Sequence, residues 1–289
     1  MSGETATPSG LAAKVDKKRK RHAEESSKET KAAASKPTGD VSEGHQKKKK
    51  RKNGNKKTED TDKPKMIRGE PLEKERKGGM DESIGKMDGR LLADHFAQKA
   101  KRHNKELTAV ELSDISVPDS AFLDTSSFDA ARTLEKLPDF LKAFSPNKGV
   151  DFEKASQHKG TPHTIVVSPA GLRAADVVRS LRTFQTKESP IGKLFAKHIK
   201  LEEAKQFLDR ARVAIGAGTP ARISDLIDSG SLKLDELERI VIDGSYVDQK
   251  QRGIFDMKET HLPLLKLLTR SEFRERYGAK QKGIKILVF

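Results

Sequence analysis

Residues 217–246 read AGTPARISDLIDSGSLKLDELERIVIDGSY, and this stretch decides the fold. It begins at the end of an apolar run, VAIGAG (213–218), and continues into an amphipathic helix with Thr219 as the expected N-cap and Gly230 as the stop signal. It closes on a second apolar run, ERIVID (238–243). A strand, a helix and another buried strand in this order predict a βαβ unit with two parallel strands.

The same alternation extends to both sides of this unit. HTIVVS (163–168) predicts a strand, PAGLRAADVVRSLRTF (169–184) an amphipathic helix, and IKILVF (284–289) a last strand. The pattern predicts an α/β fold, with a parallel sheet and helices on both faces. Ligands of such sheets bind at the carboxyl ends of the strands. We therefore expect three loops to lie side by side there: Ser168 to Arg173, Gly216 to Arg222, and Asp243 to Asp248.

The charge of the chain is concentrated in its N-terminal quarter. The 289 residues include 58 Lys and Arg against 43 Asp and Glu, and residues 1–79 hold 23 of these basic and 13 of these acidic residues. Residues 1–79 also contain almost no large apolar side chains, so burial cannot offset the ordering cost of about 1–2 kcal/mol per residue. We expect a disordered basic tail over 1–79, a helical extension and connector over 80–120, and the α/β domain over 121–289.

Two basic clusters lie in this tail. Such clusters are typical of nuclear-import signals and of arms that bind polyanions, and the alternative is a tail that only adds solubility. Binding of this kind to nucleic acid depends on phosphate contacts and falls steeply with salt. The clusters comprise Lys17, Lys18, Arg19, Lys20, Arg21 and Lys47, Lys48, Lys49, Lys50, Arg51, Lys52.

Several classes of site and protein are excluded by composition. The chain has no cysteine, which excludes disulfides, Cys-type zinc sites and thiol catalysis. Its eight histidines are scattered without an HxH or HxxxH pair, so we expect no metal site. No apolar run approaches the roughly 18–20 residues of a membrane helix, and the start MSGETATPSG lacks the apolar core of a secretory signal. We expect no cofactor, no membrane partner and no small-molecule substrate.

Two segments outside the predicted sheet leave alternatives open. GRLLADHFAQKAKRHNKEL (89–107) places Leu92, Phe96 and Ala100 on one helical stripe, which either docks on the domain or contacts a partner. SYVDQKQRGIFDM (245–257) ends in an apolar group that either packs on the sheet of its own chain or binds another protein.

Residues 163–289 resemble the first RecA-like domain of a DEAD-box RNA helicase, from its second strand onward. IVVSPAGLRAADVV (165–178) stands where those helicases carry a PTRELA-type loop, and residues 217–246 resemble GTPGRLLDLL…LVLDEAD with Ala221 in place of a glycine. Both helicase loops hold the RNA backbone. The resemblance therefore implies these RNA-binding candidates: Pro169, Ala170, Gly171, Leu172, Arg173, Gly218, Thr219, Pro220 and Arg222.

The ATP-binding half of the resemblance is missing. A P-loop needs GxxxxGK[ST] between a strand and a helix, so that backbone N–H groups and the Lys hold phosphates. Only GMDESIGKM (79–87) comes close, but Gly79 and Gly85 are one residue too far apart and no strand precedes them. The Asp of the DEAD box aligns with Asp243, a vestigial Walker B acid, and Gly244 replaces the Glu. We expect a pseudo-helicase without catalytic residues.

The layout of basic tail, helices and P-loop-less domain is similar to a small eukaryotic nucleolar family found with the small-subunit processome, the early 90S pre-ribosome. The resemblance implies a role in ribosome biogenesis and rRNA processing in the nucleus and nucleolus, with pre-rRNA or snoRNA and pre-ribosomal proteins as partners. Two alternatives stay open: an atypical DEAD-box-like ATPase or helicase, and a pure protein scaffold with vestigial RNA loops.

Overall fold

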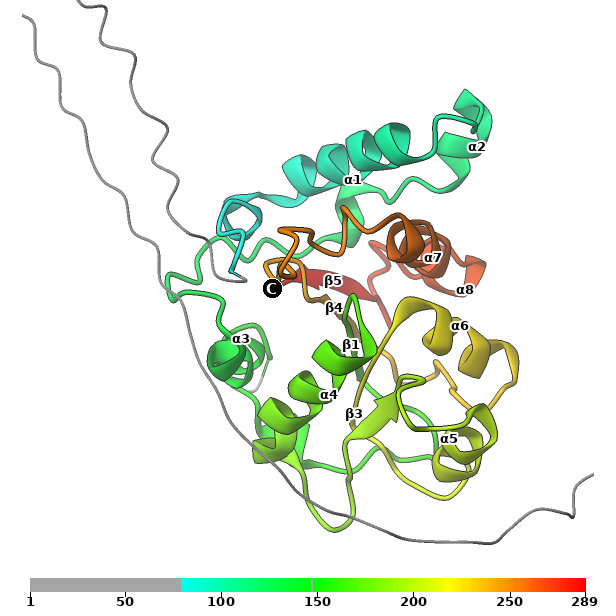
Figure 1. The fold of residues 1–289 in the computed structure, drawn as a ribbon. Helices are drawn as coiled ribbons and strands as arrows, with labels where there is room; N and C mark the ends of the chain where they lie inside the picture. The colour runs from blue at the N-terminus through cyan, green and yellow to red at the C-terminus, as the bar shows by residue number, and fades with distance from the viewer. Residues whose placement is uncertain (1–78, 147) are drawn as a thin grey trace, which may run out of the picture. The chain divides into compact units, whose positions relative to one another are not determined.

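A computed structural model describes residues 79–146 and 148–289 (Figure 1). The predicted tail and its two basic clusters lie outside these residues. Eight α-helices occur in the described part: α1 (Gly89–His103), α2 (Ala109–Asp114), α3 (Leu137–Ala143), α4 (Gly171–Ser180), α5 (Leu201–Leu208), α6 (Pro220–Asp228), α7 (Lys258–Leu268) and α8 (Ser271–Arg274). Five strands accompany them: β1 (Thr164–Val167), β2 (Gly192–Leu194), β3 (Ile215–Gly218), β4 (Arg239–Ile242) and β5 (Lys285–Val288).

The five strands form one parallel sheet in the order β2-β3-β1-β4-β5. The central strand β1 pairs Val167 with Gly218 of β3 on one side and with Ile242 of β4 on the other. Strands β1, β3 and β4 are buried along their whole length, as expected for a sheet covered on both faces. The predicted α/β fold with a parallel sheet is therefore confirmed, and β2 adds an edge strand that the sequence pattern did not reveal.

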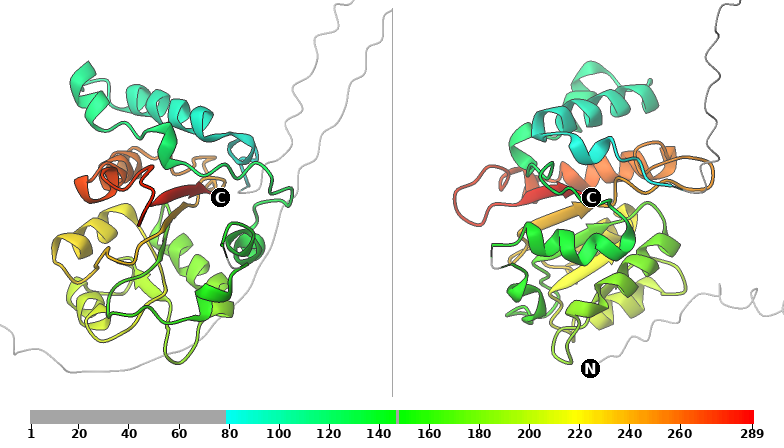
Figure 2. Two further views of the ribbon diagram at one scale, coloured as in Figure 1. Left: turned by 180° about the vertical axis from the view of Figure 1, so that it is seen from behind. Right: turned by 90° about the vertical axis from the view of Figure 1, so that its left-hand side faces the viewer.

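Helices cover both faces of the sheet (Figures 1 and 2). Because side chains of a strand alternate between faces, Val166 packs with one apolar core while Ile165 and Val167 pack with the other. The first core takes buried side chains from α3 and α4, and the second takes them from α1, α5, α6 and α7. The sheet therefore lies between two helical layers. The carboxyl ends of its strands form one edge of this sandwich.

Helix α1 docks on the domain through the predicted stripe. Leu92, Phe96 and Ala100 are 0%, 1% and 3% exposed, and the Phe96 ring lies 4.7 Å from the Phe255 ring and 5.1 Å from the Phe122 ring, centroid to centroid. Docking, rather than a free helix face for a partner, is therefore what the structure shows for this stripe. The division of the chain at residue 120 stays a prediction.

The apolar end of segment 245–257 also packs inside the domain. Ile254, Phe255 and Met257 are all buried, and Ile254 and Phe255 belong to the same core as Phe96. These side chains serve the core, so the alternative of an apolar docking surface for another protein is wrong for them.

A histidine pair joins α1 to α7 and generates a pH prediction. His261 of α7 is fully buried, its ring lies 5.4 Å from that of His103, and neither of its ring nitrogens has a hydrogen-bond partner. Burial, assisted by the nearby His103 and Lys99, lowers the pKa of His261 to about 4 from its ordinary 6.5. The carboxylate of Asp256, which pairs with Lys99, opposes this shift.

We predict that acid destabilises the protein through His261. Below pH 6.5 the unfolded chain binds a proton that the folded chain rejects, so the free energy of unfolding falls as the pH drops towards 4, by about 3 kcal/mol in all. Urea unfolding between pH 7.5 and 4.5 measures this slope. His261→Leu should flatten it, and the exposed His198→Asn should not. An unchanged slope in His261→Leu would contradict the assignment.

Candidate functional site

The three predicted loops meet at the carboxyl edge of the sheet. Because β1 lies between β3 and β4, the loops that follow these strands are neighbours (Figure 1). The Ser168 N–H donates to the Gly218 carbonyl at 2.8 Å, and the Asp243 N–H donates to the Val167 carbonyl at 2.9 Å. The expected juxtaposition of the loops is confirmed, and its centre is the start of α4.

An ion pair between Arg173 and Asp243 ties the first turn of α4 to the end of β4. The Arg173 Nε lies 2.7 Å from one Asp243 carboxylate oxygen, and its Nη2 lies 3.0 Å from the other. The side chains are 14% and 2% exposed, so water competes little for either group. The Tyr246 ring lies 4.5 Å from the guanidinium carbon and covers one of its faces. This is a bidentate, charge-assisted pair of the strong kind.

Electrostatics at this pair favour the charged form of Arg173. Burial by itself would lower the pKa of the Arg173 guanidinium, but its hydrogen bonds and charge attraction to Asp243 outweigh burial and raise that pKa. Both carboxylate oxygens of Asp243 accept from Arg173, whereas an acid that binds magnesium needs an oxygen facing the ion or its water. Sequence reasoning assigned Arg173 to RNA, and nothing in the spacing pointed to Asp243 as its partner.

Gly244 packs in a space too small for the glutamate of a DEAD box. A Cβ at this position would lie 2.7 Å from Val288 Cγ1, 3.3 Å from Phe255 Cε2 and 3.5 Å from Ile84 Cγ2. Even an alanine would require its neighbours to move. Apolar side chains from three separate segments therefore fill the space beside Gly244.

The near-match to a P-loop lies directly on this turn. Met80 forms an antiparallel bridge with Tyr246, the Asp81 N–H donates to the Ser245 carbonyl at 2.7 Å, and the Val247 N–H donates to the Gly79 carbonyl at 3.1 Å. The start of GMDESIGKM thus forms a cover over the end of β4, and Ile84 from the same stretch fills the space beside Gly244.

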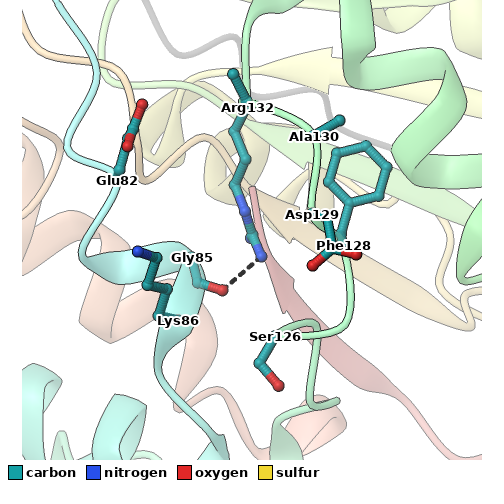
Figure 3. Close-up of a pocket in the computed structure, with 9 residues that line it drawn as sticks. Glu82, Gly85, Lys86, Ser126, Phe128, Asp129, Ala130 and Arg132 are labelled. Carbon is teal, nitrogen blue, oxygen red and sulfur yellow. Dashed lines mark hydrogen bonds between the residues drawn. The ribbon is translucent and has the colours of Figure 1, made fainter.

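Arg132 fixes this cover in place, and sequence reasoning missed it. Its guanidinium is buried and donates to the Gly85 carbonyl at 2.7 Å (Figure 3). It also donates to the carbonyl of Thr125, at 2.8 Å, and to that of Val288. Burial lowers the pKa of Arg132 to about 10. A pocket of about 400 Å³ opens beside it, with Lys86 as a further cation and Glu82 and Asp129 as anions. An arginine held by backbone carbonyls in a loop leaves no sequence motif.

The nine RNA-binding candidates fall into two groups. Pro169, Gly218 and Pro220 are buried, and Gly218 has no room for a Cβ because the carbonyl of Leu194 occupies that place. The other six retain exposure at the starts of α4 and α6, and the exposed fraction of Leu172 is 65%. The exposed or partly exposed candidates are Ala170, Gly171, Leu172, Arg173, Thr219 and Arg222.

The two helix starts present backbone rather than side-chain groups. Ala170 and Thr219 occupy the N-cap positions of α4 and α6, and neither provides a side-chain hydrogen bond to its helix. Arg222 donates from Nη1 to the Ile199 carbonyl at 3.2 Å. Thr219 is thus the predicted N-cap by position, without the expected side-chain bond.

A known protein family matches nearly the whole chain. The sequence model of a family described as "CMS1: U3-containing 90S pre-ribosomal complex subunit" matches residues 12–289. The chain belongs to the CMS1 family. It is 50% identical to Protein CMS1 of Chaetomium thermophilum over 211 residues, which cover 73% of this chain and 84% of that protein. It is 30% identical to human Protein CMSS1 over 194 residues, covering 67% and 63% of the two chains.

The CMS1 assignment confirms the predicted relationship to a pre-ribosomal family and the coarse role in ribosome biogenesis as a 90S pre-ribosomal subunit. Solved structures similar to the chain include the crystal structure of a DEAD box protein from the hyperthermophile Methanococcus jannaschii. That match has 17% identity and a TM-score of 0.35, and covers 55% of this chain and 37% of the other. Within residues 79–146 and 148–289, no three His, Asp or Glu side chains are grouped to hold a metal, and no helix is long and apolar enough to cross a membrane.

We predict that the Arg173–Asp243 pair stabilises the fold strongly. Arg173→Met or Asp243→Asn alone leaves its partner's charge unpaired and should cost about 2–4 kcal/mol of unfolding free energy, whereas the double variant should lose less than the sum. Urea unfolding of the four proteins gives the coupling energy. Arg179 and Asp176 on the same helix form an exposed pair and supply the matched cycle, with coupling near zero. Equal coupling in both cycles would argue against a special role for Asp243.

Gly244 offers a second stability test. Gly244→Ala should lower the free energy of unfolding by about 1–3 kcal/mol because its Cβ enters the Val288 contact, and Gly244→Glu by more. The control is Gly253→Ala, whose new Cβ would meet nothing nearer than 3.4 Å. A stable Gly244→Glu protein that also gains magnesium-dependent ATP binding would refute the view that this turn is closed by packing.

Proposed function

We propose that this chain is a non-enzymatic, RNA-binding subunit of the 90S pre-ribosome that acts in the nucleolus. Its domain holds pre-rRNA or snoRNA at the carboxyl edge of the sheet, and its basic tail adds nonspecific attraction and nuclear import. Membership of the CMS1 family supports the pre-ribosomal setting. The Arg173–Asp243 ion pair carries the non-enzymatic part of the proposal, because it supports a structural rather than an ATP-consuming role for Asp243.

Several features support the absence of ATP chemistry. An ATPase of this kind needs backbone N–H groups around the phosphates, a magnesium-holding acid and a group that positions water. Here the acid is neutralised by Arg173, the position of the water-positioning group is Gly244 packed against Val288, and the nearest P-loop-like stretch covers the end of β4. We therefore assign the protein to the pseudo-helicases.

The starts of α4 and α6 support an RNA-binding role. Helix starts carry unpaired N–H groups and a partial positive charge, and phosphates bind there. These two starts follow neighbouring strands. Between them runs the loop of residues 196–200. It packs Lys197 against Gly171, where a Cβ would lie 3.1 Å from Lys197 Cβ, and it offers the Ile199 carbonyl to Arg222. Lys197 and Arg222 thus accompany the two helix starts as cations.

Two alternatives make different claims about the same edge. An atypical ATPase or helicase would need a nucleotide site completed by another chain. A pure protein scaffold would keep the RNA loops only for packing, and the inward-facing Arg173 and the buried Pro169, Gly218 and Pro220 favour this reading over the ATPase. A measurement of RNA affinity distinguishes the scaffold hypothesis from the RNA-binding hypothesis.

We predict salt-sensitive RNA binding without ATP turnover. The full chain should bind a fluorescein-labelled single-stranded RNA of 20 nucleotides, measured by fluorescence anisotropy. If six residues of the tail clusters contact phosphates, affinity should fall roughly 300-fold between 50 and 200 mM salt. Phosphate release from ATP should equal the protein-free rate with and without RNA. Turnover stimulated by RNA would support the atypical ATPase.

A variant series assigns the binding to the tail or to the domain. Lys197→Ala combined with Arg222→Ala should weaken RNA binding three- to tenfold and flatten the salt dependence, whereas Arg179→Ala combined with Lys142→Ala removes the same charge elsewhere and should not. Neutralising the eleven basic residues of the tail clusters should weaken binding more. RNA crosslinking in cells, with the crosslinked peptides mapped, tests the same assignment in place. Crosslinks unchanged by the Lys197 and Arg222 substitutions would leave the loops as packing elements.

A further inference from the structure

Within the described residues, one edge strand of the sheet is covered by another segment and the other edge strand is not. At the β5 edge, Phe122 forms a bridge with Ile286, and the Leu123 N–H donates to the Ile286 carbonyl at 2.8 Å, so the connector covers that strand. At the opposite edge, β2 pairs only with β3 within the described residues. An uncovered edge strand presents backbone donors and acceptors to any extended chain that approaches it.

The backbone of Lys193 faces outward at this edge. The Thr219 N–H donates to the Leu194 carbonyl at 3.1 Å, so the backbone groups of Leu194 point towards β3. Successive residues of a strand direct their backbone groups to opposite sides, and the N–H and C=O of Lys193 therefore point away from the sheet. Its side chain is exposed, while Gly192 and Leu194 on either side of it in β2 are buried. The strand is short, so backbone pairing alone would supply few hydrogen bonds.

An apolar pocket of about 170 Å³ adjoins this edge. Helix α5 lies beside β2, and the pocket opens between them. Ile191 and Ile199 contribute aliphatic walls, Phe207 a half-buried ring and Ala204 a small side chain that leaves the space open. The volume suits one aliphatic side chain of the size of valine or leucine. Aromatic faces on which bases of RNA would stack are not the main lining.

Lys193 and Glu203 line the pocket, and Lys200 lies beside it at the start of α5. Lys193 lines its mouth and Lys200 precedes α5, and neither forms an ion pair with the described residues. The one lining acid, Glu203, is engaged at the start of α5, where it accepts from the Lys200 N–H at 3.1 Å. An occupant with carboxylates beside its apolar residue complements this surface.

We propose that the β2 edge and this pocket bind an extended acidic segment of another pre-ribosomal protein. The segment pairs with the backbone of Lys193 as an added strand, places one aliphatic side chain between Ile191, Ile199 and Phe207, and sets its carboxylates against Lys193 and Lys200. Strand addition combined with side-chain pockets is an established mode of peptide recognition. The inference adds a protein-docking surface beside the RNA-binding edge of the proposed function, and the two surfaces share the loop of residues 196–200.

Photo-crosslinking tests the identity of the occupant. A benzoylphenylalanine placed at position 207 of the full chain in cells should give a nuclease-resistant adduct with a protein. The mapped peptide should be extended, acidic and interrupted by an aliphatic residue. The same probe at Val110 in α2, exposed near the other end of the molecule, should not label that peptide (Figure 1). An adduct with RNA, a basic or helical mapped peptide, or no adduct while the chain is bound to pre-ribosomes would overturn the proposal.

A synthetic copy of the mapped segment tests the strand pairing. Lys193→Pro removes the outward N–H, and an edge strand tolerates proline there. It should weaken binding of the peptide at least tenfold, while Lys193→Ala, which keeps the N–H, should weaken it two- to threefold. Equal losses would exclude strand addition. Thermal unfolding checks the fold, and if Lys193→Pro does not fold, Ala204→Met decides instead by filling the pocket and abolishing binding.

RNA affinity separates this proposal from the proposed function. Lys193→Pro should bind the single-stranded RNA like the unaltered chain within twofold, whereas Lys197→Ala with Arg222→Ala should keep peptide binding. The inference would be refuted if Lys197→Ala with Arg222→Ala lost peptide binding while Lys193→Pro still bound the peptide. The docking site would then lie at the carboxyl edge of the sheet. A chain that binds the peptide but no RNA would refute only the RNA-binding role.

Discussion

The bidentate pair between Arg173 and Asp243 is the constraint on which the carboxyl edge of the sheet depends. It joins the first turn of α4 to the end of β4 across the centre of the sheet, and both partners are largely removed from water. Loss of either partner would leave the other charge buried and unpaired. This lowers the free energy of unfolding far more than the loss of a surface pair. Asp243 therefore holds the start of α4 against the end of β4 in this structure.

The segment before the sheet adds further packing contacts at the carboxyl edge. Ile84 fills the space beside Gly244, and Arg132 ties Gly85 to the end of β5 through backbone carbonyls. A buried guanidinium satisfied by carbonyls needs no carboxylate partner, so Arg132 holds the segments of Gly85, Thr125 and Val288 together without an acid. The helical extension is thus part of the packing of the edge. The pocket beside Arg132 carries equal numbers of acids and bases among its lining residues.

The sequence predicted most of the sheet because β1, β3, β4 and β5 are continuous apolar runs bounded by turn signals. It missed β2, whose three residues GKL show no periodicity, and Arg132, whose partners are backbone atoms remote in the chain. The location of the three loops followed from topology, but the direction of the Arg173 side chain did not, because motif spacing says nothing of which neighbouring acid it meets. The RNA contacts remain predictions.

Gly218 is required by the packing of two strands, although it also matches a sequence motif. Its α-carbon lies so near the Leu194 carbonyl that any side chain would collide with the neighbouring strand, and the following amide completes the contact. That requirement arises from inter-strand spacing and is indifferent to nucleic acid. A G-T-P signature at such a junction therefore reports how closely two backbones approach. Its presence in a chain is compatible with a helicase, a silent descendant of one, or a scaffold that never touches a phosphate.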